Sequence, residues 1–204
     1  MKTDTVNFFD RNAGHWDQTT QPCPGRIGRL LDSLGSLSGK RVLDVGCGTG
    51  VLFRSILDRI GPAGNLAGLD PSGKMLGKAR ENCSCLEVLL VQGFAESMPF
   101  ETGSFDAVVL FSCFPHLADP ETALSESARV LSPGGRILIG HASGREHINS
   151  IHRDIGGAVA DHLLQPAPVL AERLVSAGFE VDTAIDGNDL YCITGTLRKK
   201  PWSG

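Results

Sequence analysis

A run of alternating glycines is the part of this sequence best suited to binding a ligand. In residues 42–50, Val-Leu-Asp-Val-Gly-Cys-Gly-Thr-Gly, an apolar run leads directly into glycine at every second position. Glycine tolerates a positive φ and lets a ligand approach the backbone closely. A helical pattern starts at Val51, and the first turn of a helix leaves backbone N–H groups free. The stretch predicts a strand, a ligand-binding loop and a helix in direct succession.

Two acidic residues flank this loop. Asp70 ends the next apolar run, twenty positions after Gly50, where a carboxylate can accept hydrogen bonds from both hydroxyls of a ribose. The loop spacing is G-x-G-x-G, and Val51 occupies the place of the third glycine in the dinucleotide fingerprint G-x-G-x-x-G. A carboxylate at Asp44 would repel a pyrophosphate but would tolerate a cofactor with a cationic amino acid end. The pattern therefore disfavours a nicotinamide oxidoreductase.

Histidines form a second group of candidate reactive residues. His116 follows the fourth apolar run, where it could take a proton from an acceptor or could simply fix its own loop. Four of the six histidines lie in residues 141–162. His141 ends the fifth run and His152 lies on an apolar stripe at helical spacing, so they could meet over a substrate site, bind a divalent metal with a nearby carboxylate, or pack in the core. No paired-ligand spacing such as H-E-x-x-H occurs.

The apolar pattern alternates between short β-rich runs and longer amphipathic stretches. Strands are expected at residues 40–45, 65–69, 86–92, 105–111, 136–140, 180–185 and 190–197. Helices are expected at residues 51–59, 72–82, 120–131 and 168–177. Such alternation forms parallel βαβ units, whereas the last two strands are joined too briefly for a crossover and should pair antiparallel. We therefore expect an α/β fold with a doubly wound, mostly parallel sheet of seven strands and one antiparallel strand near the edge.

Composition and charge restrict the class of protein. The chain has 204 residues, a length usual for one domain. Lys plus Arg number 19 and Asp plus Glu 23, a net charge of −4, which disfavours nucleic acid as a partner. No apolar run approaches a membrane span, and residues 1–17 are polar and mixed, unlike a secretory leader. The six cysteines form no paired C-x-x-C clusters, so we expect reduced thiols in a cytoplasmic protein.

Taken together, the motifs resemble those of class I S-adenosylmethionine-dependent methyltransferases of the small-molecule type. Residues 44–50, Asp-Val-Gly-Cys-Gly-Thr-Gly, resemble the first motif of that family, and residues 70–76, Asp-Pro-Ser-Gly-Lys-Met-Leu, resemble the second. Further matches are residues 93–100 at the adenine edge, residues 105–109 and 114–120 around the fourth strand, and residues 129–136 before the fifth. The resemblance covers about residues 40–141 and, more weakly, residues 8–17.

The resemblance implies a Rossmann-like fold and S-adenosylmethionine as cofactor, with S-adenosylhomocysteine as product. The residues that it implies at the cofactor are Asp44, Gly46, Cys47, Gly48, Gly50, Asp70, Pro71, Met75, Phe94, Ala95, Glu96, Phe111 and Ser112. Asp44 and the loop would hold the methionine end, and Asp70 the ribose. Phe94 departs from the family, which often has an aspartate there for the adenine amino group. Stacking, the backbone of Ala95, or Glu96 would then hold the adenine.

The resemblance also implies methyl transfer to a small-molecule acceptor by in-line displacement, for which the protein supplies alignment, desolvation and, for an OH or NH acceptor, a base. The candidates for that base are His116, His141 and His152. The alternative is a metal- or metallo-cofactor-binding protein on the same fold, using the histidine-rich segment 141–162. The candidate metal ligands are His141, His147 and His152. We expect no nucleic-acid or membrane partner, and a monomer or homodimer.

The expected organisation is a single methyltransferase domain over residues 1–204. Residues 1–35 would form an N-terminal helical lid that includes Phe8, Phe9 and Trp16, and residues 36–141 the cofactor-binding core. Residues 142–166 are longer than an ordinary connection between a strand and a helix, and we expect an insertion over the substrate site. Residues 167–200 would form a C-terminal helix and β-hairpin.

Overall fold

The computed structural model describes residues 2–19 and 22–199. The strands are β1 (Arg41–Val45), β2 (Asn65–Asp70), β3 (Leu89–Gln92), β4 (Phe105–Phe111), β5 (Leu131–His141), β6 (Phe179–Asp186) and β7 (Tyr191–Leu197). The helices are α1 (Lys2–Asn12), α2 (Trp16–Thr19), α3 (Pro24–Asp32), α4 (Phe53–Ile60), α5 (Gly73–Asn82), α6 (Pro120–Val130), α7 (Arg145–Ile155) and α8 (Ala167–Ser176), with 3₁₀ turns η1 (Phe114–His116) and η2 (Gly157–Val159). Within these described residues, no helix is long and apolar enough to cross a membrane.

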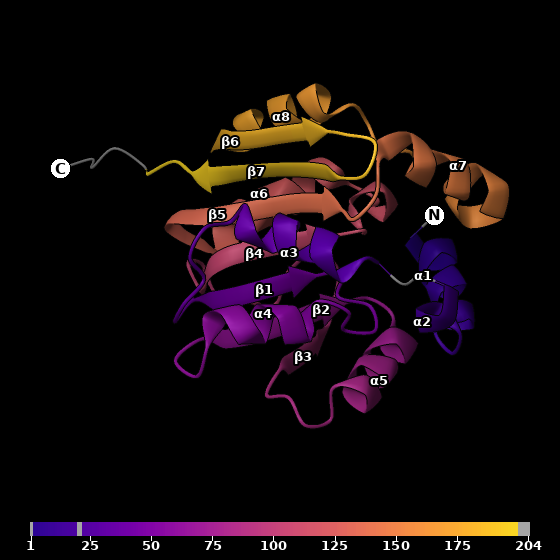
Figure 1. The fold of residues 1–204 in the computed structure, drawn as a ribbon, viewed down its shortest axis with the longest axis horizontal. Helices are drawn as coiled ribbons and strands as arrows, with labels where there is room; N and C mark the ends of the chain where they lie inside the picture. Colours follow the sequence, from indigo (N-terminus) through magenta and orange to yellow (C-terminus); the bar gives the residue numbers. More distant parts are fainter. Residues whose placement is uncertain (1, 20–21, 200–204) are drawn as a thin grey trace.

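The seven strands form one sheet in the order β3-β2-β1-β4-β5-β7-β6, with helices on both faces (Figure 1). The pairs among β1 to β5 are parallel. Strand β7 runs antiparallel to both β5 and the edge strand β6. The predicted fold class, a doubly wound and mostly parallel sheet with one reversed strand near the edge, is confirmed.

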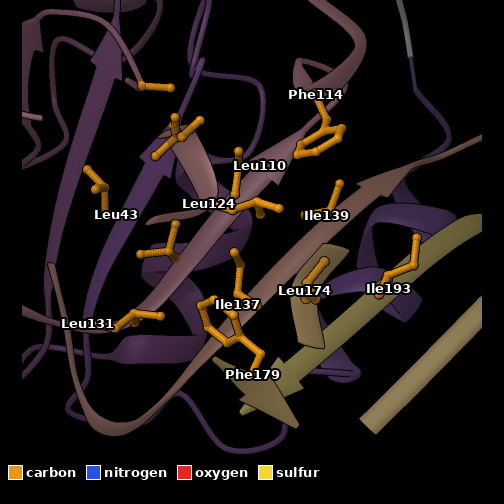
Figure 2. Packing of buried hydrophobic residues seen from close by; sticks show 14 of the residues in the cluster. Leu43, Leu110, Phe114, Leu124, Leu131, Ile137, Ile139, Leu174, Phe179 and Ile193 are labelled. Carbon is orange, nitrogen blue, oxygen red and sulfur yellow. The ribbon is translucent and has the colours of Figure 1, made fainter. Parts of the chain in front are cut away.

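Alternate residues of the central strands supply two separate cores, one on each face of the sheet. In β4, Val108 and Leu110 belong to the core under α6 and α8, whereas Ala107 and Val109 belong to the core under α3 and α4. Figure 2 shows the first core, where Leu124 of α6 and Leu174 of α8 lie among side chains of β4 and β5. Because both faces are covered, these strands are apolar on both sides, which is why they appear in the sequence as continuous apolar runs.

Two element boundaries differ from the sequence prediction by three residues or more. Strand β3 begins at Leu89 rather than at residue 86, because the Leu86 N–H donates to the Cys83 carbonyl and closes a turn. Strand β5 begins at Leu131, directly after α6, and passes through the Pro-Gly-Gly sequence that was expected to separate helix from strand. The sheet register shifts between Phe105 and Ala107 opposite this segment. Gly134 lies in this irregular segment at φ +81°, a backbone conformation that glycine adopts easily and that a regular strand does not contain.

Three segments that are distant in the sequence gather beyond the carboxyl ends of the central strands. Helices α1 and α2 lie there beside α7 (Figure 1), and α1 contacts both α5 and η2. Helix α7 starts at Arg145 and ends at Ile155, followed by Gly156 at φ +68°. The helix therefore ends at a glycine pair, because Gly156 and Gly157 both have a positive φ.

A substitution at Phe53 tests the packing beneath the glycine loop. The Phe53 side chain is 0% exposed, and a Cβ placed on Gly50 or Gly68 would lie 2.7 Å from its ring. We expect Phe53→Ala to lower the free energy of unfolding by about 3–5 kcal/mol, because the cavity left there cannot collapse without moving the loop. Urea unfolding followed by circular dichroism measures this.

Val175→Ala is the matched control, since that side chain is 44% exposed on α8. It should change the free energy of unfolding by no more than about 0.5 kcal/mol. A loss below about 1 kcal/mol for Phe53→Ala would contradict the packing described here.

Candidate active site

A single cavity of about 830 Å³ opens at the carboxyl ends of the central strands, between the glycine loop, the N-terminal helices and α7. All the residues expected at the cofactor except Gly50 line it, and so do all the histidines proposed as bases or metal ligands. Gly50 is buried instead against Phe53 and Cys83. The cavity is therefore where the fold gathers almost every residue that the sequence singled out.

The glycine loop follows β1 and crosses the end of β2. The start of the loop is held against β2, because the Leu69 carbonyl accepts hydrogen bonds from the N–H groups of Gly46 and Cys47. Gly46 has φ +68° and Gly48 has φ +54°, a region that favours glycine. A Cβ on Gly46 would also lie 2.5 Å from the Cys113 Cβ. Glycine is therefore required at position 46 for two reasons, the positive φ and the close contact with Cys113.

Two carboxylates lie side by side at the ends of β1 and β2. Asp70 accepts hydrogen bonds from the Gly48 N–H at 2.9 Å and the Ser72 N–H at 2.8 Å. Burial raises the pKa of Asp70 to about 6, although these two hydrogen bonds lower it. Asp44 is 1% exposed and has no hydrogen bond to its carboxylate among the described residues. Burial, and secondarily the charge of Asp70, raises the pKa of Asp44 well above its ordinary value.

The N-terminal helices are tied to this end of the cavity by side-chain hydrogen bonds. Thr49 Oγ1 donates to Asp17 at 2.5 Å, and Asn82 Nδ2 donates to the other oxygen of Asp17 at 2.7 Å. Ser72, the N-cap of α5, accepts from the Met75 N–H and donates to Asp10 at 2.5 Å. These contacts bring α1 and α2 against the glycine loop; the sequence indicated this segment only through the weak resemblance over residues 8–17.

The segment after β3 forms another wall. Phe94 is 41% exposed although it lines the cavity, and a β-bridge to Ser97 shapes its loop. One carboxylate oxygen of Glu96 accepts hydrogen bonds from the N–H groups of Ala118 and Asp119. Glu96 therefore holds the loop after η1 in place. All three residues suggested for holding an adenine, Phe94, Ala95 and Glu96, line this wall.

The end of β4 contributes Phe111 and Ser112. Ser112 is the one non-glycine with positive φ, +54°, among the described residues, and its N–H donates to the Gly140 carbonyl at 2.9 Å. Such conformations are strained and concentrate at functional sites. Beside it, Cys113 donates its thiol hydrogen to the Val45 carbonyl. Burial raises the pKa of the Cys113 thiol, as it does that of Cys47, so both remain protonated at neutral pH.

Three histidine rings meet on the opposite side of the cavity. The Nδ1 atoms of His116 and His162 are 3.0 Å apart, and His152 Nδ1 bonds the His162 backbone carbonyl. The ring centres of His116 and His152 are 4.9 Å apart. His162 was grouped with the other histidines in the sequence but was not among the candidate bases or ligands. Its position depends on the chain returning after α7, which no spacing rule reveals.

Burial keeps these histidines neutral. It lowers the pKa of His116 well below the ordinary value, and the neighbouring His152, His162 and His141 lower it further. Burial likewise lowers the pKa values of His152 and His162. His141 is 2% exposed, and neither of its ring nitrogens has a partner among the described residues. Burial lowers the pKa of His141 to about 3.

The metal alternative gains no support from this arrangement. Within residues 2–19 and 22–199, no group of three or more His, Cys, Asp or Glu side chains could hold a metal ion. His147 is exposed on the cavity wall and is not part of the histidine cluster. We therefore do not assign His141, His147 or His152 as metal ligands.

The sheet order, the glycine loop and the acidic residue at the next strand end define a nucleoside-binding protein of the doubly wound α/β class. Residues 43–139 match the family profile described as a methyltransferase domain. A demethylmenaquinone methyltransferase of Staphylococcus aureus is 38% identical over 111 residues, which are 54% of this chain and 46% of that protein. A 37.1 kDa protein of a Streptomyces fradiae transposon is 36% identical over 140 residues, 67% of this chain and 39% of that protein.

Solved structures agree in fold. A SAM-dependent methyltransferase from Aquifex aeolicus superposes with a TM-score of 0.73 at 21% identity, covering 91% of this chain and 98% of that one. Phosphoethanolamine N-methyltransferase 2 of Haemonchus contortus superposes with a TM-score of 0.75 at 19% identity, covering 98% of this chain and 59% of that one. This chain has a methyltransferase domain at residues 43–139 and the fold of the class I S-adenosylmethionine-dependent methyltransferases. It spans less than half the length of the curated relatives that it matches.

Because of Asp44, the free energy of unfolding should decrease as the pH rises, which is the opposite of the effect of a carboxylate with a lowered pKa. The pKa of Asp44 in the folded state is raised by burial, so the ionised carboxylate destabilises the ligand-free fold above that pKa, and the cost is absent below about pH 4. We expect Asp44→Asn to raise the free energy of unfolding by about 1–3 kcal/mol at pH 8. The gain should shrink steadily towards pH 4, as measured by urea unfolding across that range.

Asp58→Asn is the matched control, because that side chain is 60% exposed on α4. It should give no comparable gain at pH 8. An Asp44→Asn protein no more stable than wild type at pH 8 would mean that the Asp44 carboxylate is already compensated.

Proposed function

We propose that this chain transfers the methyl group of S-adenosylmethionine to a small-molecule acceptor. The observation that carries the proposal is the pair of buried carboxylates, Asp44 and Asp70, facing one cavity beside a glycine loop. A buried carboxylate is costly unless it is paired. A ligand with a cationic end and a pair of hydroxyls would compensate both acids, and S-adenosylmethionine has both features.

The chain's own residues fit such a ligand. Asp70 is already held by two backbone N–H groups, which leaves its remaining lone pairs for ribose hydroxyls. Asp44 offers its negative charge to the amino acid end. Met75 and Phe94 line the cavity on the side where an adenine would extend from the ribose. S-adenosylmethionine supplies an activated methyl group, so the protein has mainly to align the acceptor, exclude water and remove a proton.

A small acceptor is supported by the walls that enclose the cavity. Helices α1, α2 and α7 bring apolar side chains to it, including Phe9, Trp16 and Ile148. A cavity volume of about 830 Å³ suits two small reactants. The similarity to a demethylmenaquinone methyltransferase points the same way. The lid formed by residues 1–35, the cytoplasmic location and a monomeric or homodimeric state stay predictions.

Binding of S-adenosylhomocysteine is the direct test of this proposal. Native mass spectrometry of the full chain should show one S-adenosylhomocysteine per chain, and titration calorimetry should give its affinity. We expect Asp44→Asn to bind at least about tenfold more weakly, because it loses a charged partner worth about 1.5–3 kcal/mol. Asp58→Asn, on the exposed face of α4, should bind as wild type does. No adduct at millimolar S-adenosylhomocysteine would overturn the proposal.

The ties between α2 and the glycine loop predict a slow release of the cofactor product. Asp17→Ala removes the hydrogen bonds from Thr49 and Asn82, so the N-terminal helices should open more readily. We expect S-adenosylhomocysteine to dissociate roughly tenfold faster, the equivalent of about 1.4 kcal/mol. Stopped-flow displacement measures the rate.

Asn7→Ala provides the control for this change, since Asn7 is exposed on α1. It should leave the dissociation rate unchanged. If Asp17→Ala dissociates no faster than Asn7→Ala, the N-terminal helices do not retain the ligand.

A further inference from the structure

The histidine cluster, which consists of His116, His152 and His162, offers proton acceptors that the proposed cofactor contacts do not involve. A backbone carbonyl only accepts hydrogen bonds, so His152 must carry its proton on Nδ1 to bond the His162 carbonyl. When neutral, His152 therefore presents a bare Nε2. That ring lines the cavity, and Nε2 has no partner among the described residues. One wall of the cavity thus carries a fixed hydrogen-bond acceptor.

His116 and His162 share a proton between their Nδ1 atoms, 3.0 Å apart. Of two neutral rings in this contact, one must donate and the other accept. His116 lines the cavity, whereas His162 lies behind it and is partly exposed. If His116 donates from Nδ1, its Nε2 is a bare base towards the cavity, and the N–H of His162 can be solvated. This arrangement connects the cavity to the protein surface through two rings.

The surroundings keep the cluster neutral until a proton is delivered. The groups that face His116 are the ring of Phe9 from α1, His152 from α7, His141 at the end of β5, and His162. No carboxylate is among these contacts, so nothing stabilises a resident cation there. His162, which is nearer the surface, has Asp161 beside it, and that charge favours the protonated form of His162. A proton would therefore move outward, from His116 to His162.

The same walls restrict the acceptor. Arg26 is the only ammonium or guanidinium side chain among the described lining residues, and its Nη1 already donates to the Ala142 carbonyl. Four carboxylic acids also line the cavity: Asp17, Asp44, Asp70 and Glu96. An anionic acceptor would meet this one guanidinium, whose Nη1 is already engaged, against four acids. The rings and branched side chains of α1 and α7, including Phe8 and Ile151, suit an apolar ring.

Building on the proposed function, we propose that the acceptor is an uncharged aromatic compound with a hydroxyl group, that His116 is its proton acceptor, and that His162 is a positioning residue. The acceptor oxygen forms the new O–C bond while the methyl C–S bond breaks and its electron pair stays on sulfur. The hydroxyl proton passes to His116 Nε2, and the Nδ1 proton of His116 passes to His162. The positive charge lost by the sulfonium reappears on the histidine pair.

The probe for this proposal is 2-naphthol, with 2-naphthyl phosphate as the charged compound of the same ring. With S-adenosylhomocysteine bound, the full chain should bind 2-naphthol at least tenfold more tightly than the phosphate in ligand-observed NMR. With S-adenosylmethionine, it should form 2-methoxynaphthalene, detected by mass spectrometry. S-adenosylhomocysteine binding without turnover of 2-naphthol would overturn the acceptor class and leave the proposed function standing. Absence of S-adenosylhomocysteine binding would instead overturn the proposed function.

Variants separate the roles of the two rings. His116→Gln should lower kcat about 100-fold or more, the usual worth of a general base, with S-adenosylhomocysteine affinity within about twofold. His162→Gln keeps an acceptor for the His116 Nδ1–H but cannot take up a proton, so its kcat should lie between those of wild type and His162→Phe. His15→Gln, an exposed histidine outside the cavity lining, is the matched control and should behave as wild type.

Two readouts distinguish this mechanism from a packing role. The rate should be lost as pH falls through the lowered pKa of His116, on a limb below pH 6.5 that is absent in His116→Gln. Histidine ¹⁵N NMR at pH 7 should show His116 as the single Nδ1–H tautomer in wild type and His162→Gln, and as a mixture in His162→Phe. An Nε2–H tautomer in wild type, or a His116→Gln variant with wild-type kcat, would overturn the proposal.

Discussion

Two buried carboxylates at the ends of neighbouring strands are the constraint on which the rest of this structure depends. Parallel pairing of β1 with β2 brings Asp44 and Asp70 to the same edge of the sheet, and burial there makes each charge costly. Backbone N–H groups compensate Asp70 in part, whereas Asp44 has no hydrogen bond among the described residues. The glycine loop must turn tightly between them, which requires positive φ at Gly46 and close contact with Cys113.

The opposite side of the cavity has a different character. Its polar groups are imidazoles kept neutral by burial, and they stand among aromatic and branched side chains from α1 and α7. One cavity therefore has an acidic end and an apolar end with proton acceptors. Such a polarity difference suits two reactants of unlike chemistry, one cationic and one uncharged, held end to end. The hydrogen bonds that Asp10 and Asp17 accept link the two ends, because they hold the N-terminal helices against the glycine loop and the start of α5.

The sequence predicted the sheet with few errors, and it singled out the residues that line the acidic side of the cavity. Continuous apolar runs separated by amphipathic stretches are a local signal. All seven strands could therefore be inferred, together with the antiparallel pairing of the last two. The errors fall where neighbours override local preference. Pro133 and its glycines suggested a loop, but pairing with β4 continues the strand through a bulge. Gly50 belongs to the motif by spacing, yet the packing of Phe53 and Cys83 turns it away from the cavity.

Local patterns by themselves determined the fold class, the glycine loop and the acids that flank it, because each depends on residues close together in the chain. Only the tertiary structure decided which histidines lie together. His116 and His162 are 46 residues apart and become partners through the return of the chain after α7. The closure of α1 and α2 over the loop is decided in the same way, by Asp17 meeting Thr49 and Asn82. Contacts of this kind have no sequence period, since they arise only when separate elements pack against one another.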